Sequence, residues 1–325
     1  MKNTTRPRRR GGLRVAVAAL ATILATGLGA PPVSATAGGD DVSPMIVGGE
    51  LARVAYAGIG SLQLDKNGHR NWHSCNVVRI SSRFALTPSH CVDLPPAAAL
   101  DRAGAKDNAA LRAFRVTSPA ERDGQLDPRD PSQYTIRFET INRFAGGVTT
   151  GVRSITRPEK WAWGEHDKDG KVWDIALIEL DRPVWTGRPG RIAVPQETTS
   201  VRALGWGMTK PKPSQWGAPA PARLRELDAP IVPPGNCASE KIGAAELCLG
   251  VAPKGGALCV GDSGGAAIQR RGQDWAVVGL ASRSLTLECV SPTIFTEIAP
   301  YRGWIITEML KRGEWISQAD LTLAG

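Results

Sequence analysis

The stretch CVGDSGG at residues 259–265 carries the strongest chemical signal in the chain. A serine between glycines has an uncrowded backbone and an exposed hydroxyl. Such a turn can also direct successive N–H groups toward one point. Acyl transfer needs both features, a nucleophile and donors for the oxyanion. Because an ordinary glycine-rich hairpin turn has the same composition, the rest of the sequence has to decide between the two interpretations.

The order of the histidines narrows the choice of fold. Residues 261–265 also fit the G-x-S-x-G elbow of α/β-hydrolases, in which the histidine follows the serine. All four histidines of this chain, at positions 69, 73, 90 and 166, precede Ser263. An α/β-hydrolase triad with this serine is therefore excluded. A histidine, aspartate, serine order along the chain remains.

His90 is the best candidate for a general base. It follows the apolar run 84–87 and adjoins Cys91, so a strand end tied by a disulfide would hold it rigidly. His73, two residues before a cysteine, is the second candidate. His69 and His166 lie in polar, charged stretches, and we expect them to be solvated.

Asp174 is the carboxylate set most deeply in apolar sequence, within WDIALI at residues 173–178. An acid that orients and stabilises an imidazolium should be buried. The alternative interpretation is an acid at a strand end that faces solvent. Because the same chain also contains a candidate base, His90, and a candidate nucleophile, Ser263, we favour a buried Asp174 that orients the base.

The composition favours short strands and many turns. The 325 residues are 42% hydrophobic, which is enough for a core, and they include 36 glycines and 24 prolines. Residues 92–133 are rich in Ala, Asp, Arg and Pro, and we interpret them as long surface loops. Near the end, Tyr301, Trp304, Ile305 and Leu310 fall close to helical spacing and predict one amphipathic helix.

The amino terminus is typical of a secretory signal peptide. Six basic residues precede a charge-free apolar run from Val15 to Leu28, and small residues follow, so we expect cleavage after Ala37 or Ala35. The run is shorter than the roughly 20 residues of a spanning helix. We therefore predict a signal peptide at 1–37 and a secreted, extracellular product with no membrane segment. Arg8–Arg10 leaves Sec and twin-arginine export both open.

The net charge of +9 gives no reason to expect a nucleic-acid partner. Residues 1–45 account for +4, and the remainder lacks clustered basic residues interleaved with aromatics. The Asp167–Gly170 segment hints at a calcium loop but lacks the later glutamate, so we expect a surface turn and no metal.

Six cysteines, an even number, indicate disulfides in an exported protein. Their spacing alone leaves 15 pairings open. A zinc site is the alternative, but no C-x-x-C occurs and the histidines are not at ligand spacing. The positions are Cys75, Cys91, Cys237, Cys248, Cys259 and Cys289.

Five short boxes, in order along the chain, resemble those of the chymotrypsin/trypsin-like serine peptidases. They are IVGG at 46–49, LTPSHC at 86–91, DIAL at 174–177, GWG at 205–207 and GDSGG at 261–265. The resemblance spans nearly all of 46–325. It implies an all-β fold of two packed six-stranded antiparallel β-barrels with a C-terminal α-helix. It also implies a monomeric secreted endopeptidase that acts on polypeptides without a cofactor.

The resemblance implies residue roles as well. His90 would be the general base, Asp174 its orienting acid and Ser263 the nucleophile, with the N–H groups of Gly261 and Ser263 as the oxyanion hole. Ser282 corresponds to the serine that donates a hydrogen bond to the triad aspartate. The implied disulfides are Cys75–Cys91, Cys237–Cys248 and Cys259–Cys289.

The substrate pocket transfers least directly. Its base falls at Ala257, and its walls at Leu258, Ser282, Ser284 and Thr293. With no aspartate at its base, the pocket should favour small or medium uncharged residues. Two departures from the family pattern affect the cleft: Asn76-Val77 stands in place of a Gly-Gly, and Arg283 in place of a tryptophan.

The resemblance also implies activation by cleavage. A freed Ile46 ammonium would pair with Asp262, which predicts a short propeptide at 38–45 and a mature domain at 46–325. His73 would hold Asp262 before cleavage. Met45 departs from the usual Lys or Arg, so the activating protease stays open. A catalytically silent binding or adhesive protein on the same fold is the alternative; such proteins usually lose a triad residue, and none is lost here.

Overall fold

The computed structural model describes residues 46–66, 69–95, 127–196, 200–210, 212, 220–286, 288–316 and 321, which belong to one unit, 43–325. The expected signal peptide and propeptide lie outside the described residues. So does most of the long loop expected at 92–133, of which residues 92–95 and 127–133 are described.

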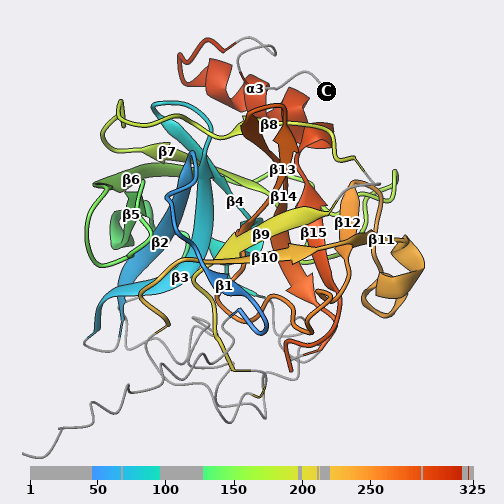
Figure 1. Ribbon diagram of the computed structural model, residues 1–325. Coiled ribbons are helices and arrows are strands. Elements are labelled where there is room, and N and C mark those ends of the chain that lie inside the picture. Colours follow the sequence, from blue (N-terminus) through green and yellow to red (C-terminus); the bar gives the residue numbers. More distant parts are fainter. Residues whose placement is uncertain are drawn as a thin grey trace, which may run out of the picture. The chain divides into compact units, whose positions relative to one another are not determined.

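Six strands of the first half form a closed barrel, shown in blue to green in Figure 1. Alternate residues of the strand at Tyr134–Phe138 are buried inside it, as the two-residue period of a strand requires. In barrel order the strands are β2 (Ile59–Lys66), β3 (His69–Arg79), β4 (Phe84–Thr87), β7 (Ala176–Leu180), β6 (Val148–Thr156) and β5 (Tyr134–Phe138).

The second half is a nine-stranded sheet. Its main path runs β1-β10-β9-β13-β14-β15-β12-β11, and β8 pairs with β14. The strands are β1 (Glu50–Leu51), β8 (Arg191–Ile192), β9 (Val201–Gly205), β10 (Arg225–Ala229), β11 (Ile231–Val232), β12 (Glu246–Leu249), β13 (Ala266–Arg271), β14 (Asp274–Ser284) and β15 (Thr293–Glu297).

This sheet curls round, because β10 and β11 are consecutive in the chain but lie near opposite ends of the strand path. Only Pro230 separates these two strands, and proline has no N–H for a strand ladder. β10 pairs with β9, whereas β11 pairs with β12. The segment 225–232 is thus one bent strand that closes a ring of six strands, with β1 and β8 as additions at its edges.

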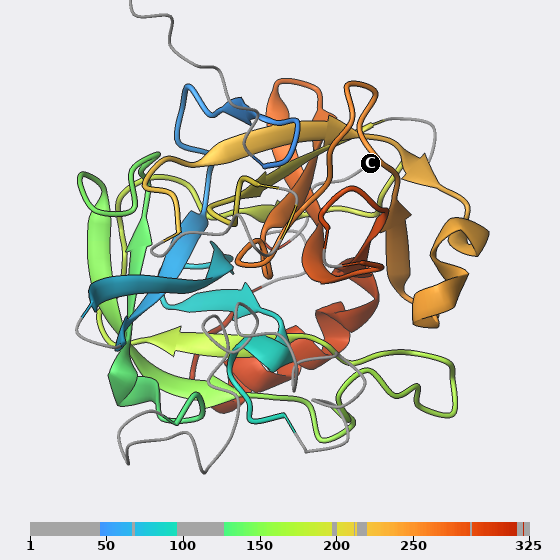
Figure 2. The same cartoon turned by 90° about the horizontal axis from the view of Figure 1, so that it is seen from below.

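The two halves pack through a shared core. Neighbouring residues of one strand face different sides: Ala85 and Val278 point into their own barrels, whereas Leu86 and Val277 join the cluster between them. The helix α3 (Arg302–Lys311) completes this cluster (Figure 2). The predicted all-β class with a C-terminal helix is confirmed.

The buried face of α3 differs in one residue from the expected one. Ile305 and Met309, four residues apart, are fully buried, whereas Leu310 is 40% exposed. Residues four apart share a helix face, so Met309 takes the place that we expected for Leu310. Within the described part of the chain, no helix is long and apolar enough to cross a membrane.

Three disulfides join the six cysteines in the pairing that the resemblance implied: Cys75–Cys91, Cys237–Cys248 and Cys259–Cys289. The first ties β3 to the short helix η1 (Ser89–Cys91), and the second ties η4 (Pro234–Glu240) to β12. Each such cross-link is worth typically about 2–4 kcal/mol. The remaining short helices are η2 (Pro131–Gln133) and η5 (Ala299–Tyr301).

Candidate active site

His90 lies in the short helix η1, directly after β4. The hydroxyl of Ser89 donates to the carbonyl of Ile175 at 2.7 Å and ties this turn to the segment that carries Asp174. His90 Nδ1 lies 2.8 Å from Asp174 Oδ2, and the His90 backbone N–H donates to Oδ1 at 3.0 Å. Because an ionised carboxylate only accepts, Nδ1 carries the proton, and in the neutral ring Nε2 is left as a proton acceptor.

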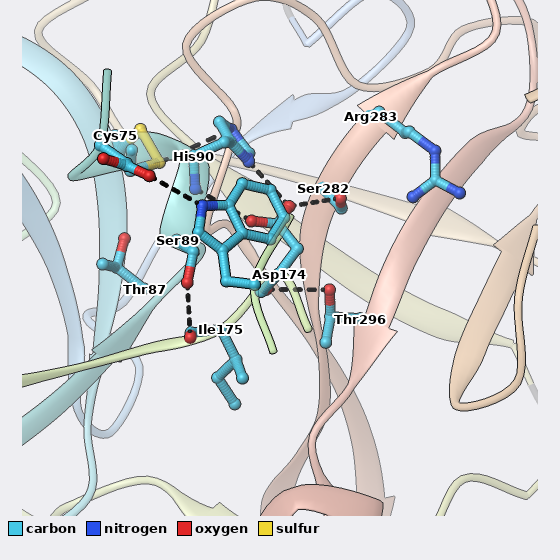
Figure 3. A network of polar contacts seen from close by, with 12 residues as sticks. Cys75, Thr87, Ser89, His90, Asp174, Ile175, Ser282, Arg283 and Thr296 are labelled. Atoms are coloured by element: carbon cyan, nitrogen blue, oxygen red, sulfur yellow. Dashed lines mark hydrogen bonds and ion pairs between the residues drawn. A yellow bond between two sulfur atoms is a disulfide. The ribbon is translucent and has the colours of Figure 1, made fainter. Parts of the chain in front are cut away.

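Asp174 lies where the two barrels meet. It is 2% exposed. From the second barrel, Ser282 Oγ donates to its Oδ2 at 2.6 Å, and Thr296 Oγ1 donates to its backbone carbonyl at 3.1 Å. Figure 3 shows His90, Asp174 and Ser282 joined in one chain of hydrogen bonds, with Arg283 next along β14.

The pKa of Asp174 lies below its ordinary value. Burial by itself raises the pKa, but attraction to His90 and the hydrogen bonds from His90 and Ser282 outweigh it. The carboxylate therefore stays ionised inside the protein. The burial of Asp174 contradicts the alternative of a strand-end acid that faces solvent.

The loop that carries Ser263 presents two backbone N–H groups. The carbonyl of Val260 accepts from Met208 N–H at 2.8 Å. Across a trans peptide the next N–H, that of Gly261, points the opposite way. Gly261 has a φ of +90°, which favours glycine. Among the described residues, the N–H groups of Gly261 and Ser263 have no hydrogen-bond partner.

Ser263 lines the same cleft as His90 and Asp174. No hydrogen bond joins Ser263 to His90 in the described part of the chain, and the contact of His90 Nε2 is with Cys91 Sγ at 3.7 Å. In enzymes without a substrate, such bonds are often long and tighten only in the complex. The structure thus brings the three predicted residues to one cleft, with the histidine–aspartate bond formed.

Asp262 is buried, and no side chain of the described residues donates a hydrogen bond to it. It is 1% exposed, and its two oxygens accept from the backbone N–H groups of Gly207 and Cys259, both at 2.8 Å. Burial raises its pKa to about 7, although these bonds and the charge of Arg225 oppose the rise. A positive charge placed beside Asp262 would therefore stabilise its ionised form.

The side chain of Ile46 is fully buried and packs against Leu227 and Ala252. Its φ of 32° is strained for a β-branched residue. No ion pair between Ile46 and Asp262 forms in this continuous chain, in which the backbone N of Ile46 is part of a peptide bond.

His73 contacts the neighbour of Asp262 instead of Asp262 itself. Its Nε2 lies 2.8 Å from the carbonyl of Gly261, and its Nδ1 lies 2.8 Å from Ser61 Oγ. Complete burial lowers the pKa of His73 to about 3, and the charge of Arg143 adds to this shift. The ring is therefore neutral, and its N–H donates to the Gly261 carbonyl; the expected contact between His73 and Asp262 is not formed.

The cleft has a volume of about 520 Å³. The expected pocket residues Leu258, Ser282, Ser284 and Thr293 line it. Ala257, the neighbour of Leu258, is 3% exposed and is not among the residues that line the cleft, so its place at the base of the pocket stays a prediction. The hydroxyl of Thr293 has no hydrogen-bond partner among the residues described.

Two further walls flank the cleft, of which only the first was not anticipated from the sequence. Trp161 and Trp163 form one, with ring centroids 5.4 Å apart, and Trp161 Nε1 donates to Asp93 at 3.0 Å. In the other, Arg283 pairs with Glu246 at 2.6 Å. The sequence signal for the first wall was the triplet WAW at 161–163, within the segment between the base and the acid.

Asp167 forms the expected surface turn. One oxygen accepts from the N–H groups of Asp169 and Lys171, and the other from Trp173 Nε1 and Lys160. These donors hold its pKa below the ordinary value. The only group at metal-ligand distances among the described residues is Cys75, His90 and Cys91, and its two sulfurs are joined in a disulfide.

Comparison with known proteins agrees with this geometry. The family described as Trypsin matches residues 130–305, more than half of the chain. Granzyme M of Rattus norvegicus is 31% identical over 247 residues, 72% of this chain and 78% of that protein. Granzyme M of Homo sapiens is 25% identical over 303 residues, covering 89% and 96%, and testisin of Homo sapiens is 25% identical over 308 residues, covering 90% and 86%.

The chain therefore belongs to the trypsin family of serine endopeptidases, which act on polypeptides. The resemblance inferred from five short boxes is confirmed at the level of family and fold.

Proposed function

We propose that this protein hydrolyses peptide bonds through an acyl-enzyme on Ser263. His90 Nε2 removes the hydroxyl proton as Ser263 Oγ attacks the substrate carbonyl, and it then protonates the leaving amine. Asp174 holds the imidazole in the correct tautomer and stabilises the imidazolium. The N–H groups of Gly261 and Ser263 stabilise the oxyanion. Water, activated by His90, then releases the acyl group.

The observation that carries this proposal is the bond from His90 Nδ1 to a buried, ionised Asp174, in the cleft that Ser263 also lines. This arrangement leaves Nε2 as an acceptor on the side of the ring away from the acid. No other histidine in the described residues contacts a buried carboxylate.

A fluorophosphonate probe tests the proposal. We expect the activated protein to be labelled at Ser263, as read by peptide mass spectrometry, and Ser263→Ala to stay unlabelled. Ser284→Ala, a second serine of the cleft, is the matched control and should still be labelled. A correctly processed protein that takes no label would support a silent binding protein on the same fold.

We propose further that export removes residues 1–37 and that cleavage after Met45 activates the domain. The freed Ile46 ammonium would pair with Asp262. The burial of Ile46, the raised pKa of Asp262 and the strained φ of Ile46 support this pairing. Cutting the Met45–Ile46 bond would remove the constraint on φ. Breaking such a buried pair costs about 3–5 kcal/mol.

Amino-terminal sequencing of the labelled, active fraction tests activation. We expect Ile46 as its first residue, released by a separate activating protease, and a monomer by light scattering. An active fraction that begins at any other residue contradicts the proposed pair.

The proposed preference at the scissile residue is for small or medium uncharged side chains. Leu258 and Thr293 line the cleft, and Ala257 provides no acid beneath it. Profiling on a peptide library should show cleavage after such residues. Cleavage mainly after Lys or Arg would contradict this part of the proposal.

A further inference from the structure

Asn76 occupies an unusual position beneath the loop that carries Ser263. It is fully buried on β3 and is one of the residues at which the sequence departs from the family pattern. Its backbone N–H donates to the carbonyl of Ser263 at 2.7 Å. Its backbone carbonyl lies so close to Gly264 that a Cβ there would overlap it.

The side chain of Asn76 adds contacts that a glycine cannot make. Its Nδ2 donates to the carbonyl of Gly261 at 3.0 Å and to the carbonyl of Ser263 at 3.1 Å. Two carbonyl oxygens accept only, so the amide nitrogen must face them. One side chain thus holds the carbonyls of Gly261 and Ser263, each of which lies in the peptide group that follows a proposed oxyanion-hole N–H.

A second chain of hydrogen-bonded polar groups also ends at the carbonyl of Gly261. Gln63 Nε2 donates to Ser61 Oγ at 3.1 Å, Ser61 Oγ lies 2.8 Å from His73 Nδ1, and His73 Nε2 lies 2.8 Å from the Gly261 carbonyl. Because a carbonyl needs a donor, the proton of the neutral ring is on Nε2, and Ser61 donates to Nδ1. The Gly261 carbonyl therefore receives two donors from the first barrel.

Stability alone does not explain Asn76. Its Oδ1 is buried without a hydrogen-bond partner in the part of the chain that the structure describes. A buried acceptor without a partner destabilises the fold, whereas an apolar side chain in this place would leave no such atom. The cost is accepted at a position whose backbone N–H and side-chain nitrogen both donate to the loop that carries Ser263.

We propose that Asn76 is a positioning residue that holds the oxyanion-hole loop in register with the first barrel. The proposal rests on the proposed function of Ser263. By bridging the carbonyls of Gly261 and Ser263, the amide fixes the peptide groups that follow these two residues, and through the backbone it restrains the preceding peptide groups, which carry the two N–H groups. The two N–H groups then keep the spacing that a developing oxyanion requires.

The test uses the processed full domain, with the concentration of active sites counted by fluorophosphonate labelling. Asn76→Ala should lower kcat about 10- to 100-fold on a peptide substrate and leave KM within about twofold, because the oxyanion exists only in the transition state. Thr150→Val is the matched control. It removes a buried hydroxyl that, like the Asn76 amide, donates to a backbone carbonyl, that of Arg182, on the far side of the first barrel.

Asn76→Asp sharpens the test, because its shape is kept while a carboxylate turns acceptors toward the two carbonyls. We expect a larger loss of kcat than in Asn76→Ala. If both variants lose thermal stability as Thr150→Val does but keep the wild-type kcat, Asn76 has only a structural role and the proposal is overturned.

Hydrogen exchange tests the contact without turnover. Peptides that cover residues 259–265 should exchange faster in Asn76→Ala and remain unchanged in Thr150→Val. Wild-type protein that takes no fluorophosphonate label would refute the proposed function of Ser263. Faster exchange at residues 259–265 in Asn76→Ala would then still support the proposal that Asn76 holds this loop. If the wild type is labelled by the fluorophosphonate but Asn76→Ala changes neither hydrogen exchange nor kcat, only the positioning role of Asn76 is refuted.

Discussion

The site contains two buried aspartates with opposite properties. Asp174 is 2% exposed and Asp262 is 1% exposed. Yet the pKa of Asp174 is lowered, whereas that of Asp262 is raised to about 7. The burial is the same, so the difference lies in the partners. Asp174 has His90 and the hydroxyl of Ser282, whereas Asp262 has two backbone N–H groups.

Under the proposed activation, the two halves of the site are completed at different times. The cluster around Asp174 is complete in the continuous chain, because all of its donors are side chains or backbone already in place. The loop around Asp262 contains a carboxylate whose ionised form lacks a cation near enough to restore its ordinary pKa. A new positive charge, which the proposed cleavage supplies, would stabilise the second half and not the first.

The largest loss of activity should come from a substitution in the cluster around Asp174. Asp174→Asn replaces the acceptor of the His90 Nδ1 proton and favours the wrong tautomer, so kcat should fall about 10⁴-fold. The measurement is kcat of the processed enzyme with thermal stability as a control. A loss below about tenfold in a folded variant would remove Asp174 from the proposed triad.

The next largest loss of activity should come from a substitution of Asp262. Asp262→Asn removes the proposed partner of the Ile46 ammonium, which is worth about 3–5 kcal/mol, so activity of the processed enzyme should fall about 200- to 5,000-fold. Fluorophosphonate labelling rates measure it. Equal rates in wild type and variant would show that no buried pair forms.

The same two forms should differ in their pH dependence. In the uncleaved chain the pKa of Asp262 is raised from 3.8 to about 7, so the stability that its neutral form contributes is lost as pH rises through about 7. In the cleaved chain the ammonium lowers this pKa again. The melting temperature of cleaved minus uncleaved protein should therefore be larger at about pH 8 than at about pH 5.

A control for this pH dependence is Asp262→Asn in the uncleaved chain. It removes the titrating group, so its stability relative to wild type should be higher at the upper pH than at the lower. A difference between the two forms that does not change with pH would contradict the assignment to Asp262.

A smaller effect should come from the segment that follows Ile46. Gly256 has a φ of +124°, and a Cβ there would overlap the carbonyl of Val47. Gly256→Ala should hinder docking of this segment and lower activity about 10- to 100-fold. Gly272→Ala is the matched control: its φ is also positive, at +59°, but no atom lies within 4 Å of the added carbon. Equal activity of both variants would contradict the docking.

The smallest effect should come from Ser282→Ala. It removes one of the donors to Asp174 Oδ2 and leaves both bonds from His90. A hydrogen bond to a charged group is worth about 1.5–3 kcal/mol in stability, and we expect kcat to fall about tenfold or less. A loss as large as that of Asp174→Asn would mean that Ser282, not His90, keeps Asp174 in place.

Much of the fold was predictable because its signals are local. The boxes around His90 and Ser263 name residue types that their chemistry requires, and the even number of cysteines indicates disulfides. The helix at residues 302–311 followed from apolar spacing, although Met309 rather than Leu310 is buried. Both residues are apolar neighbours, and only the packing of α3 against the barrels decides between them.

The contacts of the site were less predictable because they join distant segments. Ala257 was expected to line the cleft, but its place depends on how the loop before Ser263 folds. The bond from His73 to Gly261 spans 188 residues, and that from Asn76 spans 185. The sequence marked Asn76 as a departure but could not indicate which carbonyls its amide would reach.

The amino-acid sequence by itself determined the class of fold and the family, and it supplied the three side chains that we propose carry acyl transfer. These follow from residue type, order and spacing, which are properties of the chain. Only the tertiary structure decided that Asp174 is ionised, that Asp262 is not fully so at neutral pH, and that Asn76 bridges two carbonyls. These properties depend on burial and on partners brought from both barrels, because the energy of a charge or a polar atom is set by what surrounds it and not by its neighbours in sequence.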